Sequence, residues 1–592
     1  MKRALTLFFT LLLALPLLLN AAELSYSVEF EGLYDSDALR SVKEVSQLIA
    51  LKKHRPSSLG ALRYRADADV ADIVKVLHGR GYYEAAVTVR MEEVMDEMRV
   101  TMIIKPGPIY TIGSYEVRLY CRVPEACVQC TQISPEVLEM TPGKSAEAPK
   151  ILQAELKILE LLADCGYPLA SIVEREMVAD GEKKSVEILV KVDTGPLTHF
   201  GLPSLSGQRR VRPEFIEKKI LWKQGDLYQD TKVERTQSAL LDTGLFSAVM
   251  ITHEDALNEA GELPMRIDVT ENKHRSVHVG ISYQTVFGPG GTFGWEHRNI
   301  NGLGRKLSIH GEVTRISHSG MATYNIPDFH NPHQEFVGQA QAMHESITAY
   351  SERSYNLLGR IERKFGERFR ASIGLKGEEL IVRDSVENGN FPLFELPLYF
   401  RWSSADDLLD PTSGATWQYI ATPTVNVRRS AKFYLYEEMI QSVYLPLTKN
   451  RKVVLAQKVT LGSIFSGGLD DVPVPKRFLG GSEEDLRGYK YLTVSPLFHH
   501  HKPIGGRSAV YYTLETRFRV SKSIGLVPFF DAGNVYRTML PTFRGKWRKS
   551  VGLGVRIFSF IGPLRFDVGV PLNRRKGLDS KYRLFVSIGQ MF

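Results

Sequence analysis

Apolar residues recur with two different periods in the two parts of the chain. Up to about Asn272 they have helical spacing, and three such runs each end at a glycine that precedes a β-prone segment. Glycine ends a helix because it adopts the left-handed cap conformation at little cost. The runs are VLHGRGYYEAAVTV around Gly81, LLADCGYPLASIV around Gly166 and LLDTGLFSAVMI around Gly244. They predict three repeats of one α+β unit.

A second strand and a turn complete each repeat. Alternating or β-branched segments follow the glycine runs at residues 98–104, 185–192 and 265–269. Gly-Pro turns in KPGPIYTIGSY and DTGPLTHFGLP end one unit and open the next. We therefore expect units of strand–helix–helix–strand–strand at residues 23–105, 106–195 and 196–273.

Beyond His274 the period changes to two, which is typical of strands with one apolar and one polar face. The segment SVHVGISY places Val277, Val279 and Ile281 on one face, and Leu584, Val586 and Ile588 alternate toward the terminal Phe592. In a membrane barrel the apolar face meets lipid and the other face lines a wet lumen. Residues 274–592 are thus expected to form a transmembrane antiparallel β-barrel of about 12 to 18 strands. A soluble β-sandwich is the alternative.

The N-terminus has the pattern of a secretory signal. Lys2 and Arg3 precede an apolar stretch, and small residues near Ala22 follow it. The stretch is shorter than the ~20 residues of a membrane-spanning helix, although an anchor helix remains the alternative. We therefore expect residues 1–22 to be a signal peptide and the mature chain to be exported.

Four cysteines lie close together in the second unit. An exported protein meets oxidising conditions, so one or two disulfides are expected, and three pairings of four cysteines are possible. The Cys127-x-x-Cys130 spacing also permits zinc. The candidates are Cys121, Cys127, Cys130 and Cys165.

Composition and motifs argue against nucleic-acid binding and catalysis. The net charge of +8 is small for 592 residues. The sequence contains neither G-x-S-x-G nor H-E-x-x-H, and Gly288, Gly290 and Gly291 lack the Lys-Ser/Thr of a P-loop. The tract His499–His501 fits a polar loop, with metal binding as the alternative. We expect no enzyme, cofactor or resident metal.

Five motifs resemble the outer-membrane insertase superfamily, which includes BamA, TamA and the two-partner secretion transporters. The most specific is FLGGSEEDLRGYKYL, with Gly480, Gly481, Arg487, Gly488 and Tyr489, which resembles the superfamily's RGY/RGF loop. The others are GPGGTFGWEHRNINGLGRKL (288–307), DLLDPTSG (407–414), VPFFDAGNVY and GPLRFDVGVPLN (562–573). The three α+β repeats resemble polypeptide-transport-associated (POTRA) domains, with a generic α+β array as the alternative.

This resemblance implies a fold of three POTRA repeats followed by a 16-strand barrel. It also implies that the RGY loop folds into the lumen, where Arg487 pairs with inward carboxylates at the positions of Glu515 and Asp531. An arginine in a barrel needs such partners because an unpaired buried charge is costly. Two carboxylates would leave one excess negative charge, so a further cation or water is expected. The three glycines are expected to allow the tight reversal of the loop.

A three-repeat arm resembles TamA-type members in particular. The implied location is the outer membrane, with the repeats in the periplasm. The implied partners are outer-membrane lipid, an inner-membrane-anchored TamB-like protein, and unfolded autotransporter or barrel clients. Clients would enter at a lateral seam between the first and last strands, near Val277, Val279, Ile281 and Leu584, Val586, Ile588, Phe592. A passive pore for protein or lipid and an inter-membrane anchor are the alternatives.

Overall fold

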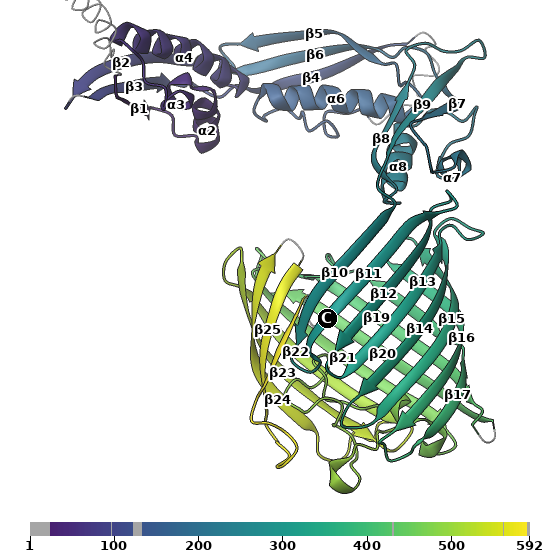
Figure 1. The fold of residues 1–592 in the computed structure, drawn as a ribbon. Helices are drawn as coiled ribbons and strands as arrows, with labels where there is room; N and C mark the ends of the chain where they lie inside the picture. Colours follow the sequence, from purple (N-terminus) through teal and green to yellow (C-terminus); the bar gives the residue numbers. More distant parts are fainter. Residues whose placement is uncertain (1–23, 96, 122–132, 429–430, 560–561, 589–592) are drawn as a thin grey trace, which may run out of the picture. The chain divides into compact units, whose positions relative to one another are not determined.

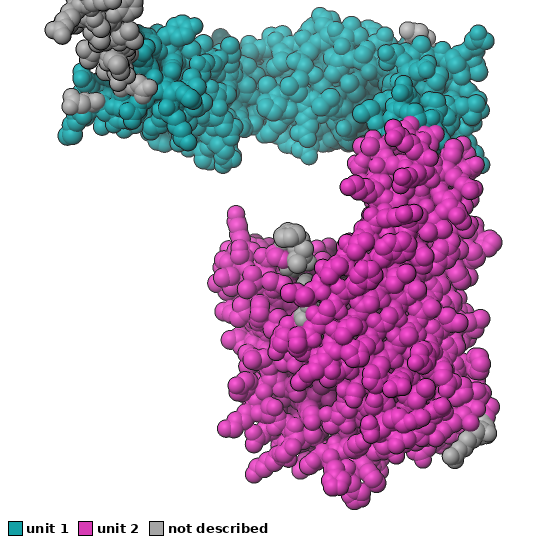
Figure 2. Space-filling model, in the orientation of Figure 1, with its two compact units in different colours: residues 1–206, 219–239, 249–268 teal, residues 207–218, 240–248, 269–592 magenta. Residues whose placement is uncertain are grey.

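The computed structural model describes residues 24–95, 97–121, 133–428, 431–559 and 562–588. The signal-peptide prediction therefore lies outside the described residues. Within the described ranges, no helix combines the length and the apolar character needed to cross a membrane. The chain divides into two compact units, drawn in teal and magenta in Figure 2, and each is described by itself.

Three small α/β repeats follow one another in the first part of the chain (Figure 1). The first contains β1 (Tyr26–Glu31), α2 (Ser36–Val45), α3 (Gln47–Ala50), α4 (Leu59–Gly79), β2 (Ala86–Val94) and β3 (Glu97–Lys105). The second contains β4 (Thr111–Tyr120), α6 (Ala148–Asp164), β5 (Ser171–Asp180) and β6 (Ser185–Asp193). The third contains β7 (His199–Ser206), α7 (Pro213–Glu217), α8 (Asp230–Leu241), β8 (Phe246–His253) and β9 (Glu262–Glu271).

The repeats share one sheet topology. In each, the third strand lies between the other two, parallel to the first and antiparallel to the second, giving the orders β1-β3-β2, β4-β6-β5 and β7-β9-β8. Gly81, Gly166 and Gly244 follow the long helices with φ of +91°, +96° and +68°, the left-handed conformation that glycine adopts readily. The expected two helices per unit are found in the third repeat, whereas the first has three; in the second, residues 122–132 lie outside the described residues, and the described part has one helix.

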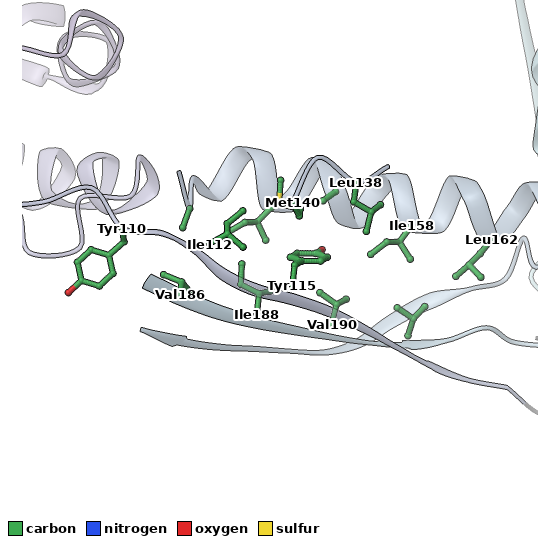
Figure 3. Close-up of a cluster of buried hydrophobic side chains, with 14 of the residues drawn as sticks. Tyr110, Ile112, Tyr115, Leu138, Met140, Ile158, Leu162, Val186, Ile188 and Val190 are labelled. Carbon is green, nitrogen blue, oxygen red and sulfur yellow. The ribbon is translucent and has the colours of Figure 1, made fainter. Parts of the chain in front are cut away.

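The core of the second repeat shows why its helix forms where it does. Ile151, Ile158 and Leu162 recur on one face of α6 and are buried against Tyr115 and Val190 of the sheet (Figure 3). Burying one such side chain contributes ~1.5–3 kcal/mol, so the sheet-facing stripe holds the helix in place.

Truncating this stripe gives a first test of the arm. We expect Ile158→Ala to destabilise the second repeat by ~2–5 kcal/mol, because the fully buried side chain leaves a cavity. Limited proteolysis of the full-length protein over a temperature series should then cut this repeat at a lower temperature. Leu152→Ala on the exposed face of α6 is the matched control, since Leu152 is 50% exposed. Equal cutting of the two variants would contradict the packing described.

The cysteines give a second test. Cys121 and Cys165 are each disulfide-bonded, while Cys127 and Cys130 lie outside the described residues. We expect maleimide to label at most two thiols in the unfolded, unreduced protein, and neither Cys121 nor Cys165. Labelling of all four thiols, measured by mass spectrometry with a reduced sample as the positive control, would refute the disulfide interpretation.

The second part of the chain is one antiparallel sheet in which strands pair in sequence order and curl round into a barrel (Figure 1). Its strands are β10 (Arg275–Gln284), β11 (Gly288–Ile300), β12 (Arg305–Thr314), β13 (Ser317–Ile326), β14 (Gln334–Ser346), β15 (Ser351–Phe365), β16 (Phe369–Arg383), β17 (Gly389–Glu395), β18 (Leu398–Ser403), β19 (Gly414–Asn426), β20 (Lys432–Pro446), β21 (Val453–Ser466), β22 (Ser508–Arg519), β23 (Ile524–Tyr536), β24 (Arg548–Ser559), β25 (Gly562–Pro571) and β26 (Arg583–Ile588).

Among the described residues these 17 strands occupy sixteen positions round the sheet. Both β17 and β18 pair with β16 on one side and β19 on the other, so they are two pieces of one strand. Pro397 lies between them, where a residue without an N–H interrupts the ladder. Sixteen positions agree with the strand number that the resemblance implied.

Alternation along β15 shows how the sheet separates its two faces. Glu352, Ser354 and Asn356 are buried on the lumen side, whereas Arg353, Tyr355 and Leu357 are exposed on the outer side. Side chains on one strand face point the same way, so the register fixes which residues of neighbouring strands share the outer wall.

The turn between β11 and β12 is held by a loop that precedes α7. The Arg212 N–H donates to the Gly302 carbonyl at 2.9 Å, and the Asn299 amide donates to the Arg210 carbonyl at 3.1 Å. Glu271 at the end of β9 accepts the N–H groups of residues 209, 210 and 211 at 2.7, 2.8 and 2.8 Å. Partial burial would raise the pKa of Glu271, but these three donors outweigh it and hold the pKa below its ordinary value. The hairpin of β11 and β12 is thus tied to this loop.

Candidate functional site

A loop between β21 and β22, residues 467–507, folds into the barrel and is called the lumen loop below. Leu486 and Tyr489 of this loop are fully buried and pack in one apolar cluster with Tyr434, Tyr511 and Val535 of the barrel wall. The Tyr489 hydroxyl also hydrogen-bonds the Lys549 carbonyl at 2.9 Å. Packing and hydrogen bonding together fix the loop against the inner wall.

Arg487 of the lumen loop is fully buried and surrounded by carboxylates. Its Nε and Nη2 donate to the two oxygens of Asp531 at 3.0 and 2.8 Å, and its own backbone N–H adds a third bond at 3.2 Å. Its Nη1 donates to Glu515 at 2.7 Å and to Asp567 at 2.9 Å. The guanidinium also lies over the Phe529 ring, 3.4 Å from its centroid. The bidentate fork on Asp531 is a strong charge-assisted geometry that lysine cannot reproduce.

Three more arginines surround these carboxylates. Arg517 contacts Glu515 at 3.0 Å, while Arg556 and Arg565 contact Asp567 at 2.6 and 2.7 Å. The expectation of a further cation beside Arg487 is confirmed, since these arginines neutralise the carboxylates. Among the described residues the network holds four arginines and three carboxylates: Arg487, Arg517, Arg556, Arg565, Glu515, Asp531 and Asp567.

Strand alternation brings this network together. All its wall residues lie on the inward faces of β22, β23, β24 and β25, which are consecutive neighbours. Our sequence reasoning missed Asp567 and the three wall arginines, although opposite charges two residues apart are visible in Glu515-x-Arg517 and Arg565-x-Asp567. Such pairs on one strand face would have indicated them.

The loop glycines have two different roles. Gly481 has φ of +105° and makes the chain reversal, as expected. Gly480 and Gly488 do not need that conformation, so the expectation that all three permit the reversal is wrong. At Gly488 an added Cβ would lie 2.7 Å from Ser550 and 2.9 Å from the Pro571 nitrogen, so this glycine permits close approach to the wall.

The lumen loop also contacts the opposite wall. Lys476 lies 2.7 Å from Glu378 of β16 and 3.5 Å from Glu395 of β17, and Lys376 contacts the same two carboxylates at 2.6 and 3.0 Å. Arg477 pairs with Glu387 at 2.9 Å. The loop therefore crosses the lumen and is held by ion pairs at both ends. The sequence motifs gave no indication of this second attachment.

The predicted seam residues lie where the two ends of the sheet meet. β10 and β26 approach each other, but the described residues form no ladder between them. Val279 and Ile281 of β10 are 80% and 96% exposed, against 43% and 69% for the outward Ile309 and Leu357 within the sheet. Leu584 is 50% exposed and Val586 is half-buried, while the Ile588 side chain and Phe592 lie outside the description.

Together these features define a class of protein: a transmembrane β-barrel with three α/β repeats ahead of it and an arginine-anchored loop in its lumen. Residues 299–592 match the Omp85 superfamily domain, and residues 202–272 match the surface antigen variable number repeat, a POTRA domain. The chain therefore combines POTRA with an Omp85 superfamily domain. It is an outer-membrane protein whose POTRA-like repeats lie in the periplasm.

Three known proteins show the extent of the likeness. The outer membrane protein assembly factor BamA of Nitratidesulfovibrio vulgaris is 24% identical, over 95% of this chain and 73% of that protein. BamA of Neisseria meningitidis is 20% identical, over 77% of this chain and 64% of that protein, so the matched region is less than two thirds of the latter. The crystal structure of Haemophilus ducreyi BamA lacking POTRA domains 1–3 superposes with a TM-score of 0.69 at 20% identity, covering 81% of this chain and all of that one. That structure supports the fold.

Proposed function

We propose that this protein assembles other β-barrel proteins in the outer membrane by opening the seam between β10 and β26. The observation that carries the proposal is the seam-side edge of β10, with which no described residue forms a ladder, and along which Val279 and Ile281 are 80% and 96% exposed. Free strand edges in lipid leave backbone groups without hydrogen bonds, each costing several kcal/mol. An incoming client strand would satisfy them by adding to the edge.

The lumen loop favours this mechanism over a passive pore. A pore needs an open path through the lumen, but here the loop is fixed to β16 and β17 on one side and to β22–β25 on the other. Cargo that leaves through the wall does not need that path. We propose that Arg487, Glu515 and Asp531 lock the loop and so keep the barrel rigid while the seam opens.

We further propose that the protein is a TamA-type member whose clients include autotransporters. The three POTRA-like repeats support this, since a three-unit arm resembles that subgroup, and their strand edges offer surfaces for a TamB-like partner anchored in the inner membrane. Edge strands recruit partners by adding a strand to the sheet.

Depletion of the protein tests this function. We expect specific barrels or autotransporters to disappear from purified outer membranes, measured by quantitative mass spectrometry, and to return with a plasmid copy. If depletion leaves the set of barrels unchanged and instead makes the outer membrane less permeable to small solutes, the assembly role is wrong and the pore is favoured. Capture of no inner-membrane protein by crosslinking from the repeats would overturn the TamB-like partner alone.

A further inference from the structure

A hollow on the outer wall of the barrel lies over β12 to β16, outside the seam strands β10 and β26. It has a volume of about 690 Å³ and continues into a second hollow of about 510 Å³. Its floor is made of small side chains on β13 and β14, and Ile309, Tyr355 and Leu357 line its sides. The floor residues are Gly320, Ala322, Gly338, Ala340 and Ala342.

The hollow is open space and not a packing defect. A Cβ built on Gly320 or on Gly377 meets no atom within 4 Å. Outward residues on this wall are in contact with lipid, so the groove is filled by hydrocarbon. It runs beside residues 320 to 324 of β13, roughly 13 Å at strand spacing, or about 10 Å across the membrane at a typical tilt. That is about a third of the ≈ 30 Å hydrocarbon thickness, which places the groove within one leaflet.

A row of basic side chains closes one end of this groove. His318, His344 and Arg353 are register partners across β13, β14 and β15, on the same outward face as the groove. The two imidazole rings lie nearly parallel with centroids 6.3 Å apart. The Nδ1 of His344 lies 2.9 Å from the Glu352 carbonyl, so Nε2 is the ring nitrogen left to bind a ligand.

This row lies at the extracellular end of the wall. β10 begins directly after the last periplasmic repeat, so its first residue is at the periplasmic side. Successive strands alternate in direction, which puts the turn between β14 and β15, residues 347–350, at the opposite side. His344 and Arg353 are each within two residues of the ends of their strands at that turn. They therefore lie near the headgroups of the outer leaflet.

Arg353 lacks a partner within the protein. Its side chain is exposed, and no described residue forms an ion pair or hydrogen bond with its guanidinium. An arginine on the lipid face is costly unless an anion or water meets it. Glu379 of β16 is exposed on the same face opposite Tyr355 and would repel an anion bound over β16. The favourable place for an anion is thus over β14 and β15.

We propose that this groove and its basic row form a binding site for a phosphorylated glycolipid of the outer leaflet, of the lipid A type. One acyl chain lies over Gly320, Ala322 and Ala340, and a phosphate is held by Arg353 with His318 and His344. Planar guanidinium groups bind phosphate bidentately. The groove provides space in which an acyl chain can lie against the wall. The bound lipid anchors a paired part of the wall that begins three strands from β10 of the moving seam.

Two variants and two controls test the site in the full-length protein. Arg353→Ala removes the charge, and Gly320→Leu fills the groove without a steric clash. Arg363→Ala at the periplasmic end of the outward face of β15 is the charge control. Gly291→Leu is the filling control, because its Cβ would meet only the Gly280 carbonyl at 4.0 Å, outside the groove.

Each protein is reconstituted in nanodiscs, and bound lipid A is measured by native mass spectrometry and by titration. We expect Arg353→Ala to weaken lipid A binding by about tenfold, the size of one charge-assisted hydrogen bond. Gly320→Leu should weaken it as well, because the leucine side chain occupies the space of the acyl chain, and the controls should leave binding unchanged. Dephosphorylated lipid A should bind the wild type correspondingly less. Equal binding by all four variants, equal binding of the dephosphorylated lipid, or full competition by inorganic phosphate or phosphatidylglycerol would overturn the site. These readouts do not depend on assembly activity, so the proposed function can fail independently.

Discussion

Replacing Arg487 by alanine is expected to lower the stability of the barrel more than any other single change in the lumen loop. Breaking a buried ion pair costs ~3–5 kcal/mol, less where lumen water reaches the exposed partner. Asp531 suffers most, because Arg487 supplies both of its guanidinium bonds, and the partners that remain are the backbone N–H of residue 487 at 3.2 Å and the Ser550 hydroxyl at 3.4 Å. Glu515 and Asp567 keep Arg517, Arg556 and Arg565.

The measurement is the temperature at which the folded, fast-migrating form disappears on a gel, together with client assembly in cells. Arg487→Lys should recover only part of the loss, since it lacks the planar fork on Asp531. The double variant Arg487→Ala, Asp531→Asn should be more stable than Arg487→Ala, because it removes the carboxylate left unpaired. If wild type and Arg487→Ala unfold at the same temperature and assemble clients equally well, the proposed lock by Arg487 is refuted. A double variant no better than the single would show that Asp531 is not the critical partner.

The period-two pattern after His274 was sufficient to predict the strands of the barrel, because each strand buries one face and exposes the other regardless of its neighbours. Gly81, Gly166 and Gly244 likewise marked the ends of helices, since a left-handed cap is a local requirement. The break between β17 and β18 was not predicted, because Pro397 interrupts a strand whose two halves still share both neighbours. Local patterns identify elements, whereas pairing decides which elements count as one strand.

The candidate site was only partly predictable for the same reason. Glu515 and Asp531 followed from motif resemblance, but Asp567 reaches Arg487 from β25, 80 residues further along the chain. The contact of Lys476 with Glu378 spans 98 residues and depends on how the loop crosses the barrel. Which charged side chains meet across the lumen depends on the strand register and on how the barrel closes. Neither can be predicted from a single segment of the sequence. The numbers of arginines and carboxylates in the network, four and three, therefore could not be predicted before the strand register was known.

Locking the seam should abolish client assembly while the barrel remains folded in the membrane. One cysteine placed within residues 277–283 of β10 and one within residues 584–588 of β26 should form a disulfide, because the two strands approach each other. The native cysteines lie in the second repeat, away from the barrel sequence. A covalent bond across the edge prevents β10 from accepting a client strand, and reduction should restore assembly.

The matched control is a cysteine pair at Leu526 and Val555, which are register partners on the outward faces of β23 and β24. This pair ties together strands that already share a ladder, so it should leave assembly unchanged in oxidised and reduced protein. An assembly factor that works through its wall requires the seam and not the interior ladders to open. A passive pore would keep working with its seam closed, since its path runs through the lumen. Full client assembly by the crosslinked seam variant, with the crosslink verified by mass spectrometry, would therefore refute the lateral opening.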